Sequence, residues 1–158
     1  MKKLFLFVTA IGAVTFLNSC SSDDNGSSDS SGNPGGTISV KINGESKTFN
    51  NVVVDKEDFV YDGVTTTYVT ATGTIGNSTN ELISFEVEMG EVGSQTSFFL
   101  KYYNGTTHYE LSPQINSVVQ TNSNNKLKGN FSGTLDAYNG SGEMVSVNLT
   151  DGSYDITH

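Results

Sequence analysis

The sequence predicts an all-β domain over residues 37–158, folded as a single antiparallel β-sandwich or a flattened β-barrel. Three observations predict this class. Thr, Val and Ile, whose branched side chains suit pleated strands, make up 35 of these 122 residues. Apolar and polar residues alternate with period two, and Asn-Gly or Asp-Gly pairs separate the alternating runs. We expect about eight to ten short strands and no helix outside the signal peptide described below.

The segment 81–89 is the clearest example of a predicted half-buried strand. Its side chains point alternately to opposite faces, so one face is apolar and the other polar. The apolar face would carry Ile83, Phe85, Val87 and Met89, and the polar face Ser84, Glu86 and Glu88.

Five pairs of turn-forming residues mark candidate hairpin loops, because Asn, Asp and Gly tolerate positive φ. They are Asn43-Gly44, Asp62-Gly63, Asn104-Gly105, Asn139-Gly140 and Asp151-Gly152. Around the first pair, a two-residue loop would put Lys47 beside Val40 on an apolar face, so the register of that hairpin stays open.

The run 98–111 predicts a hairpin with a two-residue loop at Asn104-Gly105. The face expected in the core would hold the pairs Tyr102–Thr107, Leu100–Tyr109 and Phe98–Leu111. The face expected in solvent would hold Phe99–Glu110, Lys101–His108 and Tyr103–Thr106.

The run 127–150 predicts a second hairpin, with a three-residue loop at 139–141, because a four-residue loop would set apolar residues against polar ones. The predicted pairs are Leu135–Val145, Gly133–Val147 and Phe131–Leu149. Beyond it, Asp151-Gly152 forms either a tight turn or a bulge through which one strand continues. The polar segments 76–81 and 112–126 are predicted as longer loops, with 122–125 as a mobile tip.

Residues 1–19 have the organisation of a secretory signal peptide. Lys2 and Lys3 precede an uncharged, mostly apolar run from Leu4 to Leu17. This run is too short for a transmembrane helix, which needs about 20 residues to cross about 30 Å of hydrocarbon. The chain is therefore predicted to be exported.

Cys20 is the only cysteine and follows this run in the string Leu17-Asn18-Ser19-Cys20. Here the chain resembles bacterial lipoproteins. The resemblance implies cleavage just ahead of Cys20 and a diacylglyceryl group on its thiol, so that acyl chains would hold the mature protein in a membrane. A signal peptide with an incidental cysteine is the alternative. With one cysteine, no disulfide can form within the chain.

Residues 21–36 contain only Ser, Gly, Asp, Asn and Pro, and predict a disordered tether that lipidated Cys20 begins. The acidic pair Asp23-Asp24, with Ser21 next to Cys20, is similar to the sorting signal of Bacteroidota-type lipoproteins. That resemblance implies an outer-membrane protein whose domain is displayed on the cell surface or faces the periplasm. The strings at 131–135 and 147–156 look like the ending of small β domains in such lipoproteins, and imply no activity. An acidic linker without a sorting role is the alternative.

The charge balance excludes two classes of partner. The chain has 17 Asp or Glu against 8 Lys and no Arg, which gives a net charge of −9. Nucleic acid needs a basic surface and Arg side chains that read base edges. An anionic membrane surface is excluded as an electrostatic partner for the same reason. The membrane contact that the sequence predicts is through the acyl chains on Cys20.

Groups for catalysis or metal binding are few. His158 is the last residue and is expected to fray, and His108 is expected to face Lys101 on an exposed strand without a serine nucleophile motif. His108 and Glu110 offer only two metal ligands. Carboxylates suited to calcium crowd one stretch, without the spacing of an EF-hand, at Asp55, Glu57, Asp58 and Asp62. We therefore predict no catalytic residue, metal or cofactor.

Three functional hypotheses follow. The leading one is a non-enzymatic domain, displayed on the envelope, that binds or scaffolds an unknown glycan or protein partner. Aromatic side chains expected on outward faces would serve such binding, namely Tyr68, Phe99, Tyr103 and Tyr138. The first alternative is a calycin-like barrel that carries a small apolar ligand. The second is a glycan-active enzyme that uses paired carboxylates.

Overall fold

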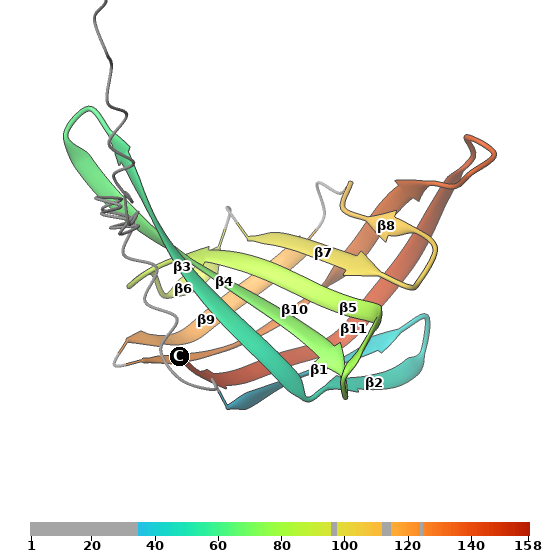
Figure 1. Ribbon diagram of the computed structural model, residues 1–158, viewed down its shortest axis with the longest axis horizontal. Coiled ribbons are helices and arrows are strands. Elements are labelled where there is room, and N and C mark those ends of the chain that lie inside the picture. The colour runs from blue at the N-terminus through green and yellow to red at the C-terminus, as the bar shows by residue number, and fades with distance from the viewer. Residues whose placement is uncertain (1–34, 96–97, 112–114, 124) are drawn as a thin grey trace, which may run out of the picture.

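The computed structural model describes residues 35–95, 98–111, 115–123 and 125–158. Within these ranges the chain is all β, and two antiparallel sheets face each other without closing into a barrel (Figure 1). The predicted all-β sandwich is thus confirmed, and the flattened barrel is not. The strands are β1 (Gly36–Ile42), β2 (Glu45–Phe49), β3 (Asn51–Tyr61), β4 (Val64–Ile75), β5 (Ser78–Glu88), β6 (Gly93–Gln95), β7 (Phe99–Tyr103), β8 (His108–Tyr109), β9 (Ile115–Ser123), β10 (Lys126–Tyr138) and β11 (Met144–Thr157).

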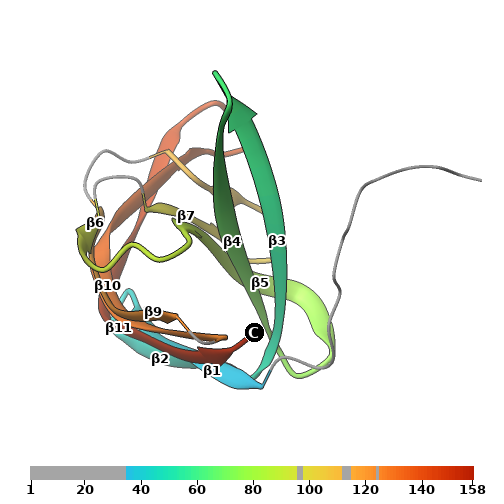
Figure 2. The same cartoon turned by 90° about the vertical axis from the view of Figure 1, so that its left-hand side faces the viewer.

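The strands divide unequally between the two sheets. The six-stranded sheet has the order β2-β1-β11-β10-β9-β6, and the five-stranded sheet the order β3-β4-β5-β7-β8 (Figure 2). The described residues form eleven strands, close to the expected number of about eight to ten. Several of them are short, as expected, but β11 spans 14 residues. Strands pass through several positions at which the sequence suggested a loop or turn.

The core between the sheets is filled by a cluster of aromatic rings. Phe85 of the five-stranded sheet packs in a tilted arrangement against Tyr154 of the six-stranded sheet, with ring centroids 4.5 Å apart. Phe98 lies 5.1 Å from Phe85 and 6.0 Å from Phe131. All four side chains are buried. Burial raises the pKa of the Tyr154 hydroxyl to about 12, so the core carries no tyrosinate at neutral pH.

Segment 81–89 forms the predicted half-buried strand along most of its length. Ile83, Phe85 and Val87 are buried. Met89 is 40% exposed, because the chain leaves β5 after Glu88 and turns at the following glycine. The period-two pattern therefore predicted the core face of β5, but not its end.

Two hairpins have the two-residue loops that their sequences suggest. Asn43 and Gly44 both have positive φ, as do Asp62 and Gly63, which suits type I′ turns. The register left open by the sequence is now defined, since Val40 pairs with Lys47. Lys47 therefore does lie on the inner face of β2.

The loop after β7 is longer than predicted. Tyr102 pairs with Tyr109 and Tyr103 with His108, which shifts the register by two residues from the predicted one. The cause is the Asn104 side chain, whose Oδ1 accepts hydrogen bonds from the backbone N–H groups of Thr106 and Thr107 at 3.1 and 2.9 Å. A shift of two preserves the faces of the strands. Leu111, predicted in the core, is instead 47% exposed and forms a bridge to Asp136.

The β10–β11 hairpin repeats this error for the same physical reason. Leu135 pairs with Val147, not with Val145, and the loop is five residues long. Asn139 Oδ1 accepts hydrogen bonds from the N–H groups of Ser141 and Glu143, both at 2.9 Å. The asparagine side chain thus closes a wider loop than its Asn-Gly sequence suggests.

Asp151-Gly152 forms a bulge, not a tight turn. β11 continues through it while the register against β1 and β10 shifts. Gly152 is required there because a Cβ atom would lie 2.5 Å from the carbonyl oxygen of Phe131 and 2.7 Å from its ring. Of the two interpretations of this pair, the bulge is confirmed.

The two predicted long loops are mostly strand. Ser78 already begins β5, and residues 115–123 form β9, while 112–114 lie outside the described residues. Exposed residues in β9 alternate with buried ones as far as Val119, and two of the buried residues of the strand, Ser117 and Asn122, are polar. β9 pairs with β10, which local composition does not reveal. The prediction of a mobile tip at 122–125 is also wrong for Asn122, whose side chain is buried and only 2% exposed.

Asn122 fastens the connection between β5 and β6 to the core. A bulge in β9 turns this side chain inward, where Nδ2 donates to the carbonyl oxygens of Glu88 and Glu91 at 2.7 and 3.1 Å. We expect Asn122→Ala to lower the free energy of unfolding by about 1–3 kcal/mol, because two carbonyl groups in a partly buried environment lose their donor. Urea denaturation of this variant beside Asn116→Ala, an exposed asparagine of the same strand, tests this. Equal losses in both variants would contradict it.

Candidate functional site

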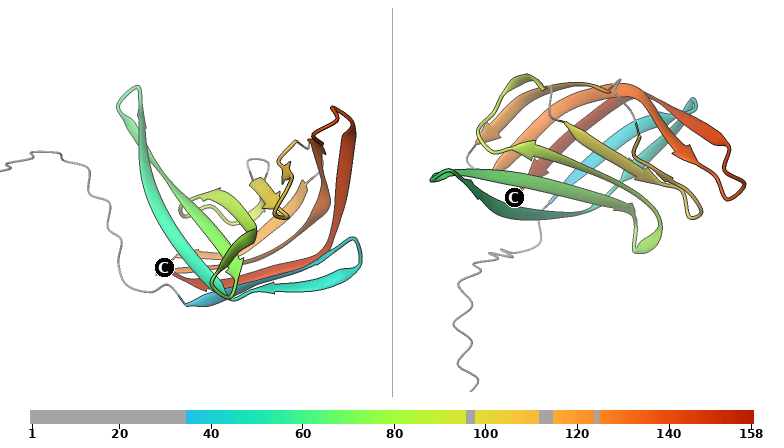
Figure 3. Two further views of the ribbon diagram at one scale, coloured as in Figure 1. Left: turned by 45° about the vertical axis from the view of Figure 1, so that its right-hand side comes forward. Right: turned by 90° about the horizontal axis from the view of Figure 1, so that it is seen from above.

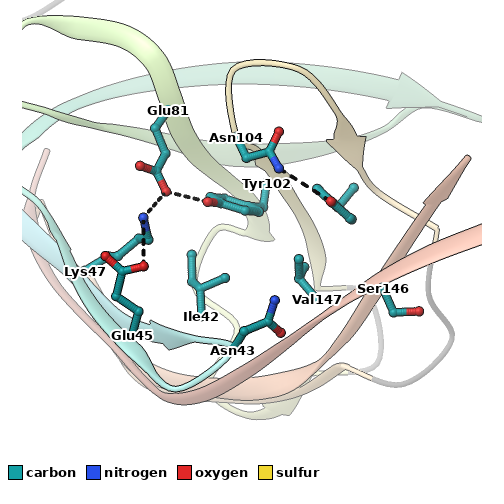
Figure 4. A pocket seen from close by; sticks show the side chains of 10 residues that line it. Ile42, Asn43, Glu45, Lys47, Glu81, Tyr102, Asn104, Ser146 and Val147 are labelled. Atoms are coloured by element: carbon teal, nitrogen blue, oxygen red, sulfur yellow. Dashed lines mark hydrogen bonds and ion pairs between the residues drawn. The ribbon is translucent and has the colours of Figure 1, made fainter. Parts of the chain in front are cut away.

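A polar pocket lies at one end of the sandwich, where the two sheets separate (Figure 4). Its volume is about 360 Å³, and it is open to solvent. Strands of both sheets and the loop after β7 supply its lining residues, which are Ile42, Asn43, Glu45, Lys47, Glu81, Tyr102, Asn104, Tyr109, Ser146 and Val147.

Lys47 is the central charged group of this pocket. The two-residue loop between β1 and β2 directs its side chain inward, and its exposed fraction is only 18%. Its Nζ lies 2.8 Å from Glu81 Oε1 on the facing sheet and 3.8 Å from Glu45 Oε2 on its own strand. The ion pair with Glu81 therefore joins the two sheets at the pocket.

Tyr102 extends this cluster from β7. Its hydroxyl donates a short hydrogen bond to Glu81 Oε1, so one carboxylate oxygen contacts both a cation and a phenol. Burial, and then the hydrogen bond to Glu81, raise the pKa of Tyr102 above its ordinary value. The phenol is thus a stable donor at neutral pH. Its ring stacks on Tyr109 with centroids 5.9 Å apart.

The pocket walls are held in place by backbone and amide contacts. Asn43 N donates to Asn148 O at 2.8 Å, and Asn148 N donates to Asn43 Oδ1 at 2.9 Å. On the other side, Asn104 Nδ2 donates to the Tyr109 hydroxyl at 3.5 Å. These contacts tie both turns to neighbouring strands, so the site is formed in advance of any ligand.

The chemistry of this lining suits binding better than covalent catalysis. Its one hydroxyl of nucleophile type, on Ser146, donates to Asp136 at 2.6 Å, and no histidine lines the pocket. The charged groups are one cation and two carboxylates. Together with the amides and phenols they form a dense set of hydrogen-bond donors and acceptors with little net charge.

No protein-family model, curated protein or solved structure gives a significant match to this chain. Its function therefore has to be argued from the geometry and chemistry of its own surface.

The histidines that the sequence singled out lie outside this pocket. His108 stacks on Tyr103 at 4.3 Å on the outer face of the five-stranded sheet, and its predicted neighbour Lys101 instead pairs with Glu110 at 3.5 Å. The expected fraying of His158 is wrong, because its N–H donates to Asn125 O at 2.7 Å. Burial, and then the positive charge of Lys56, lower the pKa of His158.

The acidic stretch of β3 does not assemble a metal site. Among the described residues, no three His, Cys, Asp or Glu side chains gather closely enough to hold a metal ion. Asp58 accepts a hydrogen bond from Thr67 at 2.6 Å, and Asp62 occupies the hairpin turn. His108 and Glu110 likewise recruit no third ligand from the described part of the chain.

The outward aromatic side chains are spread over the surface. Phe99 and Tyr138 are each 61% exposed, whereas Tyr68 and Tyr103 are half-buried. Phe99 borders a second hollow of about 310 Å³ on the outer face of the five-stranded sheet. The four residues do not form a continuous aromatic platform, since they are divided among three strands, β4, β7 and β10, and between both sheets.

The residues that matter most in the pocket were missed by the sequence analysis, although one signal was present. Lys47 on an apolar face needs a carboxylate partner from elsewhere in the fold. Glu81 is two residues before Ile83, and therefore on the same face of β5, but it lies where the predicted loop 76–81 meets the predicted strand 81–89 and was not assigned to the inner face.

Cys20, the predicted lipid-attachment residue, lies outside the described residues, as do the predicted signal peptide and nearly all of the tether. In the part of the chain that the structure describes, no helix has the length and apolar character to cross a bilayer.

Proposed function

We propose that this protein is a lipid-anchored binding protein of the cell envelope, and that the pocket around Lys47 holds a small, neutral, hydroxyl-rich ligand such as one or two sugar units. The observation that carries this proposal is the cluster of Lys47, Glu81 and Tyr102, half-buried between the sheets and open at the pocket mouth.

The ligand class follows from the groups that line the pocket. A sugar hydroxyl both donates and accepts hydrogen bonds, and here the carboxylates of Glu45 and Glu81 would accept while Lys47 and the Asn43 amide nitrogen would donate. The cluster carries two carboxylates and one ammonium, so its net charge is negative and it would repel an anionic ligand. The volume of about 360 Å³ lies at the lower end of the range for small-molecule sites.

The two alternative functions find less support. A carrier of apolar ligands needs a hollow apolar interior, but buried aromatic rings fill the space between the sheets. A glycosidase needs two carboxylates with the glycosidic bond between them. Glu45 and Glu81 both line the pocket, but the Nζ of Lys47 lies between their carboxylates, where the glycosidic bond would have to be.

The proposed location in the cell envelope is supported by the amino-acid sequence. Lys2, Lys3 and the apolar run predict export, Cys20 follows directly, and the acidic pair Asp23-Asp24 resembles an outer-membrane sorting signal. A tether of 16 residues, with a mean span of about 20–24 Å, would let the sandwich stand clear of the lipid headgroups.

Binding to an array of neutral and acidic oligosaccharides tests the pocket, with the full-length protein purified from membranes in detergent. We expect binding to neutral members and a loss of about tenfold or more in affinity for Glu81→Gln, since hydrogen bonds to charged groups contribute about 1.5–3 kcal/mol.

The matched control is Glu110→Gln, which breaks the exposed ion pair with Lys101 on the outer face. It is expected to leave affinity unchanged, and thermal melting of both variants reports whether they fold. If Glu110→Gln abolished binding while Glu81→Gln did not, the site would lie on the outer face and the proposal would be wrong. Absence of binding to any array member would also overturn the ligand class.

A further inference from the structure

The outer edge of β3 is unpaired within the described part of the chain. β3 pairs with β4 along its whole length and stands at the end of the five-stranded sheet. Figure 2 shows β3 running along one side of the sandwich, next to β4. An edge strand of 11 residues offers a row of N–H and C=O groups to a strand from another chain.

The hydrogen-bond pattern identifies the residues that offer these groups. Tyr61 and Val64 flank a two-residue loop and form a hydrogen-bonded pair, so odd-numbered residues of β3 bond to β4. Met89 N donates to Thr67 O at 2.8 Å, so the odd-numbered residues of β4 form hydrogen bonds with β5. The even-numbered residues of β4 are left to bond to β3, which agrees with this alternation. The free groups on β3 therefore belong to Val52, Val54, Lys56, Asp58 and Val60.

These five residues also share one face of the sheet, and their charges alternate in a way that selects a partner. Lys56 is half-buried on the inner face, and Asp58 is exposed two positions further along. A well-matched antiparallel strand would place an anion opposite Lys56 and a cation opposite Asp58, with apolar residues opposite Val54 and Val60. β3 itself has this pattern when it is read in the reverse direction.

We propose that the β3 edge binds β3 of a second copy of this chain, antiparallel, across a two-fold axis at Glu57. In this register Lys56 lies opposite the partner's Asp58, and Val54 opposite the partner's Val60. The two-fold axis repeats both pairs. Every hydrogen-bonded pair then joins residues whose backbone groups are free, and the two five-stranded sheets become one continuous sheet.

The charges exclude the neighbouring registers. Moving the axis to Lys56 would set this residue opposite the partner's Lys56, and moving it to Asp58 would set two aspartates together. The proposed register does place Glu57 opposite the partner's Glu57. The two Lys56–Asp58 pairs that the two-fold axis generates offset this one like-charge contact, whereas each neighbouring register has a like-charge contact and no opposite-charge pair.

The same pairing would cover apolar surface that is otherwise in water. The distal part of the β3–β4 hairpin projects beyond the body of the sandwich (Figure 3). Its apolar side chains Phe59, Val60 and Tyr61 are 57%, 64% and 75% exposed, and Val53 is 52% exposed. In the proposed register Val53 lies beside the partner's Tyr61. A two-stranded ribbon is marginally stable alone, and a partner strand on its edge would stabilise it.

Disulfide cross-linking of the full-length protein in its membrane tests the register. In the variant Glu57→Cys the two introduced thiols would face each other in a non-hydrogen-bonded pair, with Cα atoms about 4.5 Å apart, which suits a disulfide. The matched control is Asp55→Cys, on the same face of the same strand and also exposed. Its thiols would lie about 13 Å apart in this register.

On mild oxidation we expect a cross-linked dimer at least about tenfold more abundant for Glu57→Cys than for Asp55→Cys, because only the former meets the Cα limit of about 7 Å. The wild-type chain, whose one thiol is Cys20, gives the background. No dimer above background for Glu57→Cys, or equal dimer for both variants, would overturn the proposal. Neither result bears on ligand binding in the Lys47 pocket.

A charge exchange separates specific pairing from chance collision. Adding Lys56→Asp to Glu57→Cys would set two aspartates opposite each other and is expected to reduce the dimer severalfold. Adding Asp58→Lys as well restores opposite charges and is expected to restore the dimer. Cross-linking that ignores both changes would contradict a β3–β3 interface.

Discussion

Replacing Phe85 by Ala is expected to lower the free energy of unfolding by about 3–5 kcal/mol, the largest stability change that we predict for a single core residue. Phe85 is 1% exposed and its ring meets three others, at 4.5 Å from Tyr154, 5.1 Å from Phe98 and 6.5 Å from Phe131. Removing this ring takes away its own apolar burial and leaves a cavity lined by rigid rings, which cannot collapse easily.

Thermal or urea denaturation measures this effect. A loss of this size is a large part of the about 5–15 kcal/mol that stabilises ordinary domains, so the midpoint should fall by about 10 °C or more. Phe99→Ala, next to Phe98 but 61% exposed, is the matched control and should change stability by less than about 1 kcal/mol. Phe85→Leu should lie between them. Similar losses for Phe85→Ala and Phe99→Ala would contradict the packing described here.

The faces of the strands were predictable from the sequence, whereas the lengths of the loops were not. Asn104 and Asn139 each mark a turn correctly, yet each side chain caps a loop wider than the one predicted. Both registers were therefore wrong by two residues. Because side chains alternate with period two, a shift of two keeps every residue on its face, and so Leu100, Tyr109 and Leu135 are buried as predicted.

Pairing between distant segments was beyond the local signals. The segment of β9 is rich in Asn, Ser and Gln, and resembles a loop until β10 is placed beside it. Predicting the pocket likewise requires knowing which distant segments lie side by side. Lys47 could be placed on an inner face from its hairpin, but its partners Glu81 and Tyr102 come from the facing sheet, and the sequence does not state which ends of the two sheets meet.

Cys20→Ser is expected to release the protein from membranes completely, which is the largest effect expected on its location. Each methylene of a buried acyl chain contributes about 0.8 kcal/mol, and a single chain holds a protein only marginally. The several acyl chains that the lipoprotein resemblance implies would together hold it effectively permanently. The chain has a net charge of −9, so an anionic bilayer would repel it, and the described residues contain no helix that could span a bilayer.

Fractionation of cells after a carbonate wash tests this, with the wild-type protein expected in the membrane pellet and the Cys20→Ser protein in the soluble fraction. Ser21→Ala, one residue away with the thiol intact, serves as the control and should stay with the membrane. Position 20 lies before the first strand, which begins at Gly36, so the sandwich should resist protease equally in both variants. If Cys20→Ser remained in the pellet with a folded domain, the anchor would have to lie elsewhere, and the incidental-cysteine alternative would be favoured.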